Sequence, residues 1–511
     1  MSAATQASNV AAPETAASSE SWRVRFDRSP WPVIIFAGVV LIAYGYEIFA
    51  FHITTDESLS AQTSQPSWAL THAGRGRWMT GLLSLALPAN VAPTVAPALG
   101  VGMMALGLWL VTRRLLQLDR TYALIASSLA VTVPTFAFMV SFADIVYGIG
   151  AGYLLIVATL ATGKSSRAWV WAISVLLGAA AMGVYQALIL AILAGALAMA
   201  FREGTWLGLL RWVGLTIGSA VAYLAVSQLT YLVIPRLNYI ENFFNPSAFF
   251  EAPWSLLRRS IRDGLNVLAL NGDLFGLQSP LLLVTFVSMA LLALGSVLLR
   301  ASGEFRWVAL ISTLGILSIP FLAGVMSLGP VPLRSWVFLP LCLAALTAVG
   351  LHGLDLWPGG RVREGIVVAV LVLTGFTVVA QMVIGLRLLG SSQLVYEHDQ
   401  QFAYEINREI RLQIGAVPSA PLPMVPSGAW QFGEGPLTEQ REATAASVFA
   451  FGREEGPDRV VSFLANQGVP VTSPTPEETS RSESRLAEMP PWPQPGWLRV
   501  EEGVVLCRLG P

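Results

Sequence analysis

Two carboxylates and two arginines follow the first long apolar run of the chain. Together they have the chemistry to bind and transfer a charged group. The run covers residues 31–51, the acids are Asp56 and Glu57, and the arginines are Arg75 and Arg77. A carboxylate accepts a proton from a hydroxyl group, and the planar fork of arginine donors binds phosphate. Because carboxylates beside a membrane are costly unless they are hydrated or paired, this position indicates a site for a charged, lipid-linked substrate. The alternative is that both acids are ordinary solvated loop residues.

Further arginines stand where they could hold a phosphate-containing headgroup. Arg334 opens a late apolar run, and Arg258, Arg259 and Arg262 lie on the amphipathic stretch 254–268. The alternative is that each arginine snorkels or pairs with a local acid. The predicted donor-phosphate ligands are Arg77, Arg334, Arg75, Arg258 and Arg259.

A third acid and two ring side chains complete the predicted site. Asp144 lies in a loop of a few residues between two apolar runs, so we expect it at the same depth as Asp56. We predict Asp56, Glu57 and Asp144 as catalytic acids, and as ligands of Mg²⁺ or Mn²⁺ if a metal binds, although two or three acids are weak evidence for one. His72 and Trp78 are predicted to position the sugar acceptor. His72 is a candidate for accepting a proton or donating a hydrogen bond, and the alternative is a purely structural role.

Composition determines the class of protein that must position these residues. Of 511 residues, 54% are hydrophobic and only 12% are charged, whereas soluble domains carry roughly 25% charged residues. The chain is therefore a polytopic membrane protein. The net charge of −1 says nothing about a nucleic-acid partner, and no basic tract supports one. Cys342 and Cys507 lie in segments of different character, so no disulfide is expected between them.

The apolar runs predict an all-α bundle of about eleven transmembrane helices. The hairpin 168–201 is the least secure pair of predicted spans. The segment 78–90 is too short to cross a bilayer and is predicted to be an interfacial or re-entrant helix. Polar residues near span ends, such as Tyr185 and Gln186, are interpreted as packing between helices. The predicted spans are 31–51, 94–112, 121–140, 144–162, 168–185, 186–201, 212–234, 280–299, 306–326, 335–351 and 365–387.

The distribution of basic residues orients this bundle. A set of basic residues that flank the runs falls on one side when eleven spans are assumed, so that side is cytoplasmic. These residues are Arg23, Arg25, Arg28, Arg113, Arg114, Lys164, Arg167, Arg202, Arg300, Arg361 and Arg363. We therefore predict a disordered cytoplasmic tail over residues 1–29, a transmembrane catalytic domain over 30–390 and a periplasmic module over 391–511.

The last 120 or so residues predict a small α+β module with little core of its own. An amphipathic helix is expected over 395–413 and another helix over 437–465. Proline-rich linkers are expected at 417–426 and 473–495, followed by a strand-like end from Trp497 to Leu509.

Four short motifs resemble the Gtr-type O-antigen glucosyltransferases of bacteria, within the GT-C superfamily of membrane glycosyltransferases. The resemblance covers roughly 31–410. It implies an inverting enzyme of the bacterial inner membrane, which moves a sugar from a polyprenyl-phosphate donor to a glycan or lipid-linked acceptor at the periplasmic face, with Asp56 as the catalytic residue. The motifs are Thr55-Asp56-Glu57, Gly76-Arg77-Trp78-Met79, Pro332-Leu333-Arg334 and Tyr396-Glu397-His398-Asp399.

Two other functions handle the same kind of lipid. A transporter or flippase of lipid-linked saccharides usually has polar residues near the bilayer midplane and internal repeats, and neither is evident here. An O-antigen polymerase or ligase would rely on outer-loop arginines and histidines, so the acidic pair argues against it. The sequence therefore favours the transferase.

Overall fold

The computed structural model of this protein describes most of the membrane bundle and most of the C-terminal module. The described residues are 22–50, 63–87, 94–237, 252–325, 331–357, 360–415, 418–430, 447–452 and 458–510.

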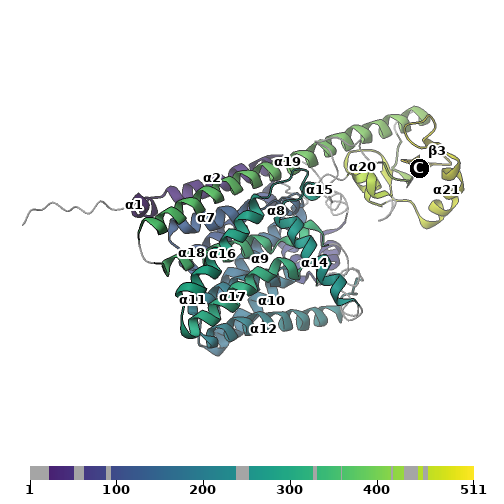
Figure 1. Cartoon of the computed structure of the whole chain (residues 1–511). Helices are drawn as coiled ribbons and strands as arrows, with labels where there is room; N and C mark the ends of the chain where they lie inside the picture. Colours follow the sequence, from purple (N-terminus) through teal and green to yellow (C-terminus); the bar gives the residue numbers. More distant parts are fainter. Residues whose placement is uncertain are drawn as a thin grey trace, which may run out of the picture.

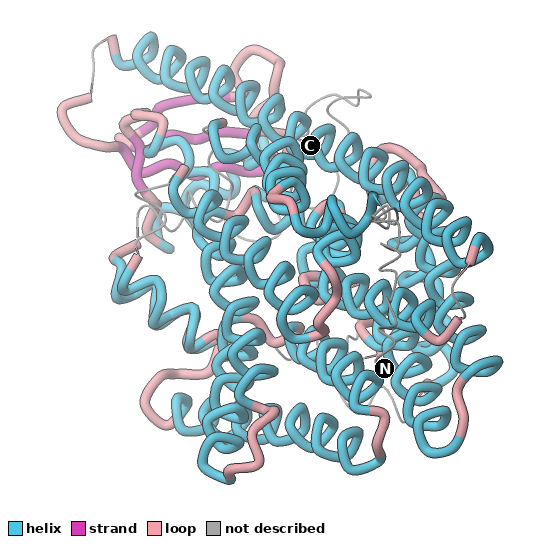
Figure 2. Tube along the Cα trace, turned by 90° about the vertical axis from the view of Figure 1, so that its left-hand side faces the viewer, coloured by secondary structure: helices cyan, strands magenta, loops and turns pink. Residues whose placement is uncertain are grey.

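The bundle consists of helices throughout its described part (Figures 1 and 2). A short helix, α1 (Trp22–Arg28), precedes it. Its long elements are α2 (Trp31–Phe49), α6 (Val95–Leu110) with the π-helix η2 (Val111–Leu115), α7 (Arg120–Val131), α8 (Pro134–Val140), α9 (Ala143–Thr162), α10 (Ala168–Val184), α11 (Leu188–Glu203), α12 (Trp206–Tyr231), α16 (Leu281–Arg300), α17 (Gly303–Leu322), α18 (Leu339–Asp355) and α19 (Arg361–Ile414). Short elements between them are α4 (Gln65–Gly74), α5 (Trp78–Ala86), α14 (Pro253–Leu268), α15 (Gly272–Phe275) and the 3-10 helix η3 (Leu333–Trp336).

The all-α polytopic class is confirmed, whereas helix length supports fewer spans than eleven. Within the described residues, eight helices are long and apolar enough to cross a membrane, or nine when α7 and α8 count as one span bent by 61°. The bend precedes Pro134, since the residue before a proline is driven away from helical dihedrals. The hairpin of α10 and α11 accounts for the other two predicted spans, and its helices have only 17 and 16 residues.

Basic side chains gather at one end of the bundle, where they cap the carbonyl ends of helices. Arg202 donates to the carbonyl of Leu115 at 2.8 Å, and Arg211 donates through Nε to the carbonyl of Gly163 at 2.9 Å. A cation at a helix C-terminus is stabilised by the helix dipole. We call this the basic end, and we call the opposite end, which holds Tyr185 and Ser335, the site end.

The described parts of the two termini lie at opposite ends of the bundle, α1 at the basic end and the C-terminal module beyond the site end (Figure 1). We therefore expect reporter enzymes fused before Trp22 and after Ile414 to be active on opposite sides of the membrane. Fusions at the turns 163–167 and 301–302 should match the N-terminal reporter, since both turns precede helices that start at the basic end. Activity of both terminal reporters on one side would contradict this arrangement.

Helix α19 joins the bundle to the C-terminal module without a break. It has 54 residues and so extends roughly 80 Å, whereas the hydrocarbon core of a bilayer is about 30 Å thick. Its second half projects beyond the site end and carries the module (Figure 1). The helix therefore passes straight through the boundary predicted at residue 390.

The module has a second hydrophobic core, formed around Phe402 of α19 and separate from the core of the bundle. Its sheet has the order β2-β1-β4-β3, in which β1 is parallel to β2 and β4, and β3 is antiparallel to β4. The elements are β1 (Leu422–Ser427), η4 (Val448–Gly452), α20 (Asp458–Asn466), β2 (Val471–Thr472), α21 (Pro476–Glu488), β3 (Leu498–Glu501) and β4 (Val504–Arg508).

Two sequence expectations for the module were wrong. The segment 417–426 is not only a linker, because it contributes strand β1 despite Pro423 and Pro426. Proline normally excludes a central strand, but Pro423 faces the two-residue β2, where few ladder bonds are lost. The segment 473–495 contains helix α21, whose capping box of Thr475 and Glu478 is a helix-start signal.

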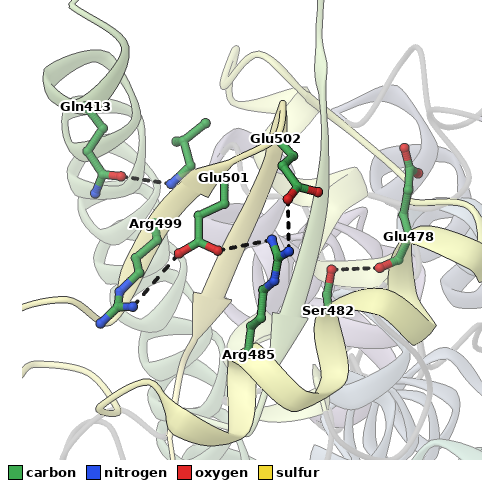
Figure 3. Close-up of polar contacts among 8 residues, drawn as sticks. Gln413, Glu478, Ser482, Arg485, Arg499, Glu501 and Glu502 are labelled. Atoms are coloured by element: carbon green, nitrogen blue, oxygen red, sulfur yellow. Dashed lines mark hydrogen bonds and ion pairs between the residues drawn. The ribbon is translucent and has the colours of Figure 1, made fainter.

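Side-chain contacts join α19, the sheet and α21 (Figure 3). Gln413, in the last turn of α19, accepts a hydrogen bond from the backbone of Val500 at 2.8 Å. Arg485 of α21 reaches Glu501 at 3.2 Å and Glu502 at 2.9 Å, at the turn between β3 and β4. These contacts hold the module to the end of the long helix.

A buried acid makes the stability of the module depend on pH. Asp399 lies in the projecting part of α19, and burial raises its pKa to about 7. Its carboxylate accepts hydrogen bonds from Ser447 Oγ at 2.6 Å and from the Val448 N–H at 2.8 Å, which lower the pKa but by less than burial raises it. The unfolded carboxyl has a pKa near 4. The protonated form of Asp399 therefore contributes fully to the free energy of unfolding below about pH 4. That contribution is lost as the pH rises through about 7.

The buried thiol of Cys507 reports opening of the module. We compare the rate at which Cys507 reacts with a maleimide with the rate in an Asp399→Asn variant at the same pH. This ratio should rise by up to roughly 80-fold between about pH 5 and pH 8. The variant serves as the control because asparagine stays neutral while thiol chemistry changes equally in both proteins. A ratio that does not vary with pH would contradict the assignment.

Candidate functional site

A tight turn between α4 and α5 presents two of the predicted arginines. Arg75, Gly76 and Arg77 form the turn, which closes when the Arg77 N–H donates to the carbonyl of His72 at 2.9 Å. Gly76 has a φ of +76°, and a Cβ there would lie 2.9 Å from the hydroxyl of Tyr223. The turn requires glycine for its backbone conformation and for this close approach.

Two other parts of the chain hold this turn through hydrogen bonds to its backbone. Gln186, between α10 and α11, donates through Nε2 to the carbonyl of Arg75 at 3.0 Å. Tyr223 of α12 donates to the carbonyl of Gly76 at 3.2 Å. The Thr80 hydroxyl of α5 donates to the carbonyl of Val184 at 2.9 Å, which ties α5 to the end of α10.

Arg77 and the segment that holds Arg334 come from distant parts of the chain and are linked through one tyrosine. Arg77 is 8% exposed, and its guanidinium carbon lies 4.5 Å from the centre of the Tyr185 ring. The hydroxyl of Tyr185 lies 3.1 Å from Ser335 Oγ, in η3 directly beside Arg334. The α4–α5 turn, the α10–α11 turn and η3 therefore meet at the site end.

Arg334 also lies close to the start of α9. Its guanidinium carbon is 5.8 Å from the centre of the Phe142 ring, and Phe142 is the N-cap residue of α9. Asp144 was expected in a short loop but is the second residue of that helix, and its side chain lies outside the described part. Asp56 and Glu57 also lie outside the described residues.

His72 lies in the last turn of α4, behind the arginines. It is 1% exposed, its ring packs edge-on against Trp68, and neither ring nitrogen has a hydrogen-bond partner among the described residues. Burial, together with Arg77 and Arg75, lowers the pKa of His72 to about 3. Such a weak base is poorly matched to neutral pH, which favours a hydrogen-bonding role over proton acceptance.

The remaining predicted residues lie apart from this cluster or pack within the protein. Trp78 is half-buried and packs against α10, where a Cβ on Gly183 would lie 2.5 Å from its ring. Arg258 and Arg259 are on α14, which packs against α16 and α17. Within the described ranges, no group of three His, Cys, Asp or Glu side chains forms a metal site.

Three residues that the sequence assigned to packing, or did not single out, contact the arginine turn directly. Tyr185, Gln186 and Tyr223 supply its ring contact and two of its hydrogen bonds. The available signal was the placement of polar side chains near span ends, which also occurs in ordinary helix packing.

Comparison with known proteins finds a family match in the N-terminal half of the chain. Residues 45–248 match the family model described as glucosyl transferase GtrII. The resemblance to Gtr-type glucosyltransferases is thereby confirmed over that region. It includes Asp56, the arginine turn and Tyr185, whereas Arg334 and α19 lie beyond it. No curated protein and no solved structure matches the chain significantly.

The hydroxyl of Tyr185 offers a test of the link between the two arginines. We expect Tyr185→Phe, which keeps the ring under Arg77 but loses the contact with Ser335, to raise the donor KM roughly fivefold, since a net hydrogen bond is worth about 1 kcal/mol. Ser335→Ala should have the same effect, and the double variant no more than either single variant. Additive effects would indicate that the hydroxyls do not act as a pair.

Proposed function

We propose that this protein is an inverting glucosyltransferase of the GT-C type. It moves a sugar from a polyprenyl-phosphate donor to a cell-envelope glycan or lipid-linked acceptor, at the periplasmic face of the bacterial inner membrane. The family match over residues 45–248 supports a glucosyltransferase, and the apolar helices support a membrane location. The observation that carries the proposal furthest is the link from Arg77 through Tyr185 to the segment of Arg334.

Two arginines at one membrane interface suit the leaving group of this reaction. As the bond between the sugar C1 and the phosphate oxygen breaks, its electron pair stays on the polyprenyl phosphate. Preorganised cations stabilise that developing charge most when they are withdrawn from water, as Arg77 is. In the proposal Arg77 and Arg334 bind the phosphate, and Arg75 supplies further positive charge.

The acceptor hydroxyl must lose its proton as the new bond to C1 forms. We assign that proton to the carboxylate of Asp56, which acts as general base. Glu57 and Asp144 then orient the acceptor, or hold Mg²⁺ or Mn²⁺ if the enzyme uses a metal. His72 stays neutral at pH 7, as its low pKa favours, and supports the turn from inside the protein, because its ring is buried.

The proposal is tested with purified protein and a polyprenyl-phosphate sugar labelled in the sugar. A transferase produces a labelled acceptor and free polyprenyl phosphate in equal amounts. A flippase moves the intact donor between leaflets and releases no polyprenyl phosphate. A polymerase or ligase transfers an oligosaccharide from a pyrophosphate carrier, so it leaves the monophosphate donor unchanged.

A further inference from the structure

Helix α14 has three distinct sides along its length. One side packs on the bundle: Ser260 contacts the carbonyl of Phe321, and a Cβ on Gly264 would lie 2.6 Å from the Phe321 ring. These small residues allow close approach to α17. The helix is therefore fixed in rotation about its own axis, which determines where its other two sides face.

The second side is an exposed apolar stripe. Trp254 is 80% exposed, and Leu257, Ile261 and Leu265 are 40–42% exposed. Their spacing of three, four and four residues places them on one face of a helix. Four large apolar side chains on an exposed face are costly in water and need a covering medium.

The third side is basic and borders the stripe. Arg258 and Arg262 follow Trp254 at intervals of four residues, so they stand one above the other beside the apolar residues. The side chain of Arg262 is 70% exposed, and its Nε lies 3.7 Å from Asp263. With Arg259, the helix carries three arginines against the single acid Asp263, a net charge of +2.

We propose that α14 is an interfacial helix that binds anionic phospholipid at the site end of the bundle. The apolar stripe lies among the outermost acyl carbons, and Arg258 and Arg262 bind lipid phosphates at the boundary with water. Tryptophan prefers this depth, and arginine beside an apolar face extends its head toward phosphate.

The surroundings of α14 identify lipid as the occupant. The helix lies between two membrane-spanning helices in the chain, α12 and α16, so it is held beside the bilayer. It lies obliquely to the long helices, at the end of the bundle from which α19 projects (Figure 1). Its net positive charge complements anionic headgroups.

The depth of the helix can be measured with spin labels. The native cysteines Cys342 and Cys507 are buried, so labels attach at introduced positions. In vesicles, labels at Leu257→Cys and Leu265→Cys should be relaxed by oxygen and shielded from a water-soluble nickel complex. A label at Ser255→Cys, an exposed position outside the stripe, should show the reverse. Protection of the stripe from both reagents would mean that protein covers it and would overturn the proposal, as would free access of nickel.

The role of the arginines is tested by lipid selectivity. With spin-labelled phosphatidylglycerol and phosphatidylcholine, the protein should prefer the anionic lipid. Arg258→Ala with Arg262→Ala should reduce that preference by up to about fivefold per charge removed at low ionic strength. The paired lysine variants should retain most of it. Arg499→Ala, which removes an exposed charge from the module, should not change it. Unchanged selectivity in the paired alanine variant would overturn the assignment.

Discussion

Replacing Asp56 by asparagine is expected to abolish sugar transfer while donor binding remains. Asparagine keeps the shape of the side chain but cannot take the proton of the acceptor hydroxyl. If Asp56 is the general base, the turnover number should fall about 100-fold or more. The measurement is turnover with a labelled polyprenyl-phosphate sugar under saturating acceptor.

Binding of the labelled donor to the same variant provides the control for folding. Retention of donor binding together with lost turnover would separate a chemical role from a structural one. Near-normal turnover in Asp56→Asn would remove the residue from the role of base. Asp144→Asn and Glu57→Gln would then be the next variants to measure.

Arg77→Ala and Arg334→Ala are expected to weaken donor use strongly. A charge-assisted contact with a desolvated phosphate is worth roughly 2–4 kcal/mol, so the donor KM should rise by about 30-fold to 1000-fold. Lysine at either position keeps the charge but loses the bidentate fork, so the rise should be smaller. The measurement is the donor KM of each variant with acceptor saturating.

Arg236→Ala is a matched control for the loss of an arginine near this end. Arg236 is exposed, and its guanidinium carbon lies 5.8 Å from the centre of the Tyr231 ring at the end of α12. It therefore lies beside a tyrosine ring, as Arg77 does. It should leave the donor KM within about twofold, as expected for an exposed charge. If alanine at both Arg77 and Arg334 leaves the donor KM unchanged, the phosphate site lies elsewhere, and Arg258 and Arg259 become the next candidates.

The sequence alone determined the membrane class and the location of most helices, because both follow from local composition. A run of about 20 apolar residues forms a helix wherever it lies in a membrane, since no water is present to satisfy an open backbone. The same local rules indicated the strand-like end, which the structure resolves as β3 and β4. They misjudged 417–426 and 473–495, where prolines stand inside a strand and at the first turn of a helix.

Local rules also selected Arg77 and Arg334 as candidate phosphate ligands, since arginine outside the basic end has no topological explanation. The connection between the Arg77 turn and the segment of Arg334 was beyond sequence reasoning. It depends on how α10 and η3 pack, and the connection runs through a tyrosine that looks like ordinary packing in the sequence.

Only the tertiary structure decided which candidates lie together and which do not. It joined the arginine turn to Tyr185, Gln186 and Tyr223, and it placed Trp78 against α10. It also buried His72 deeply enough to make it a weak base. Burial and contact depend on which helix faces meet in the folded chain. The apolar pattern of one helix fits several arrangements of the helices around it, so the sequence alone does not determine them.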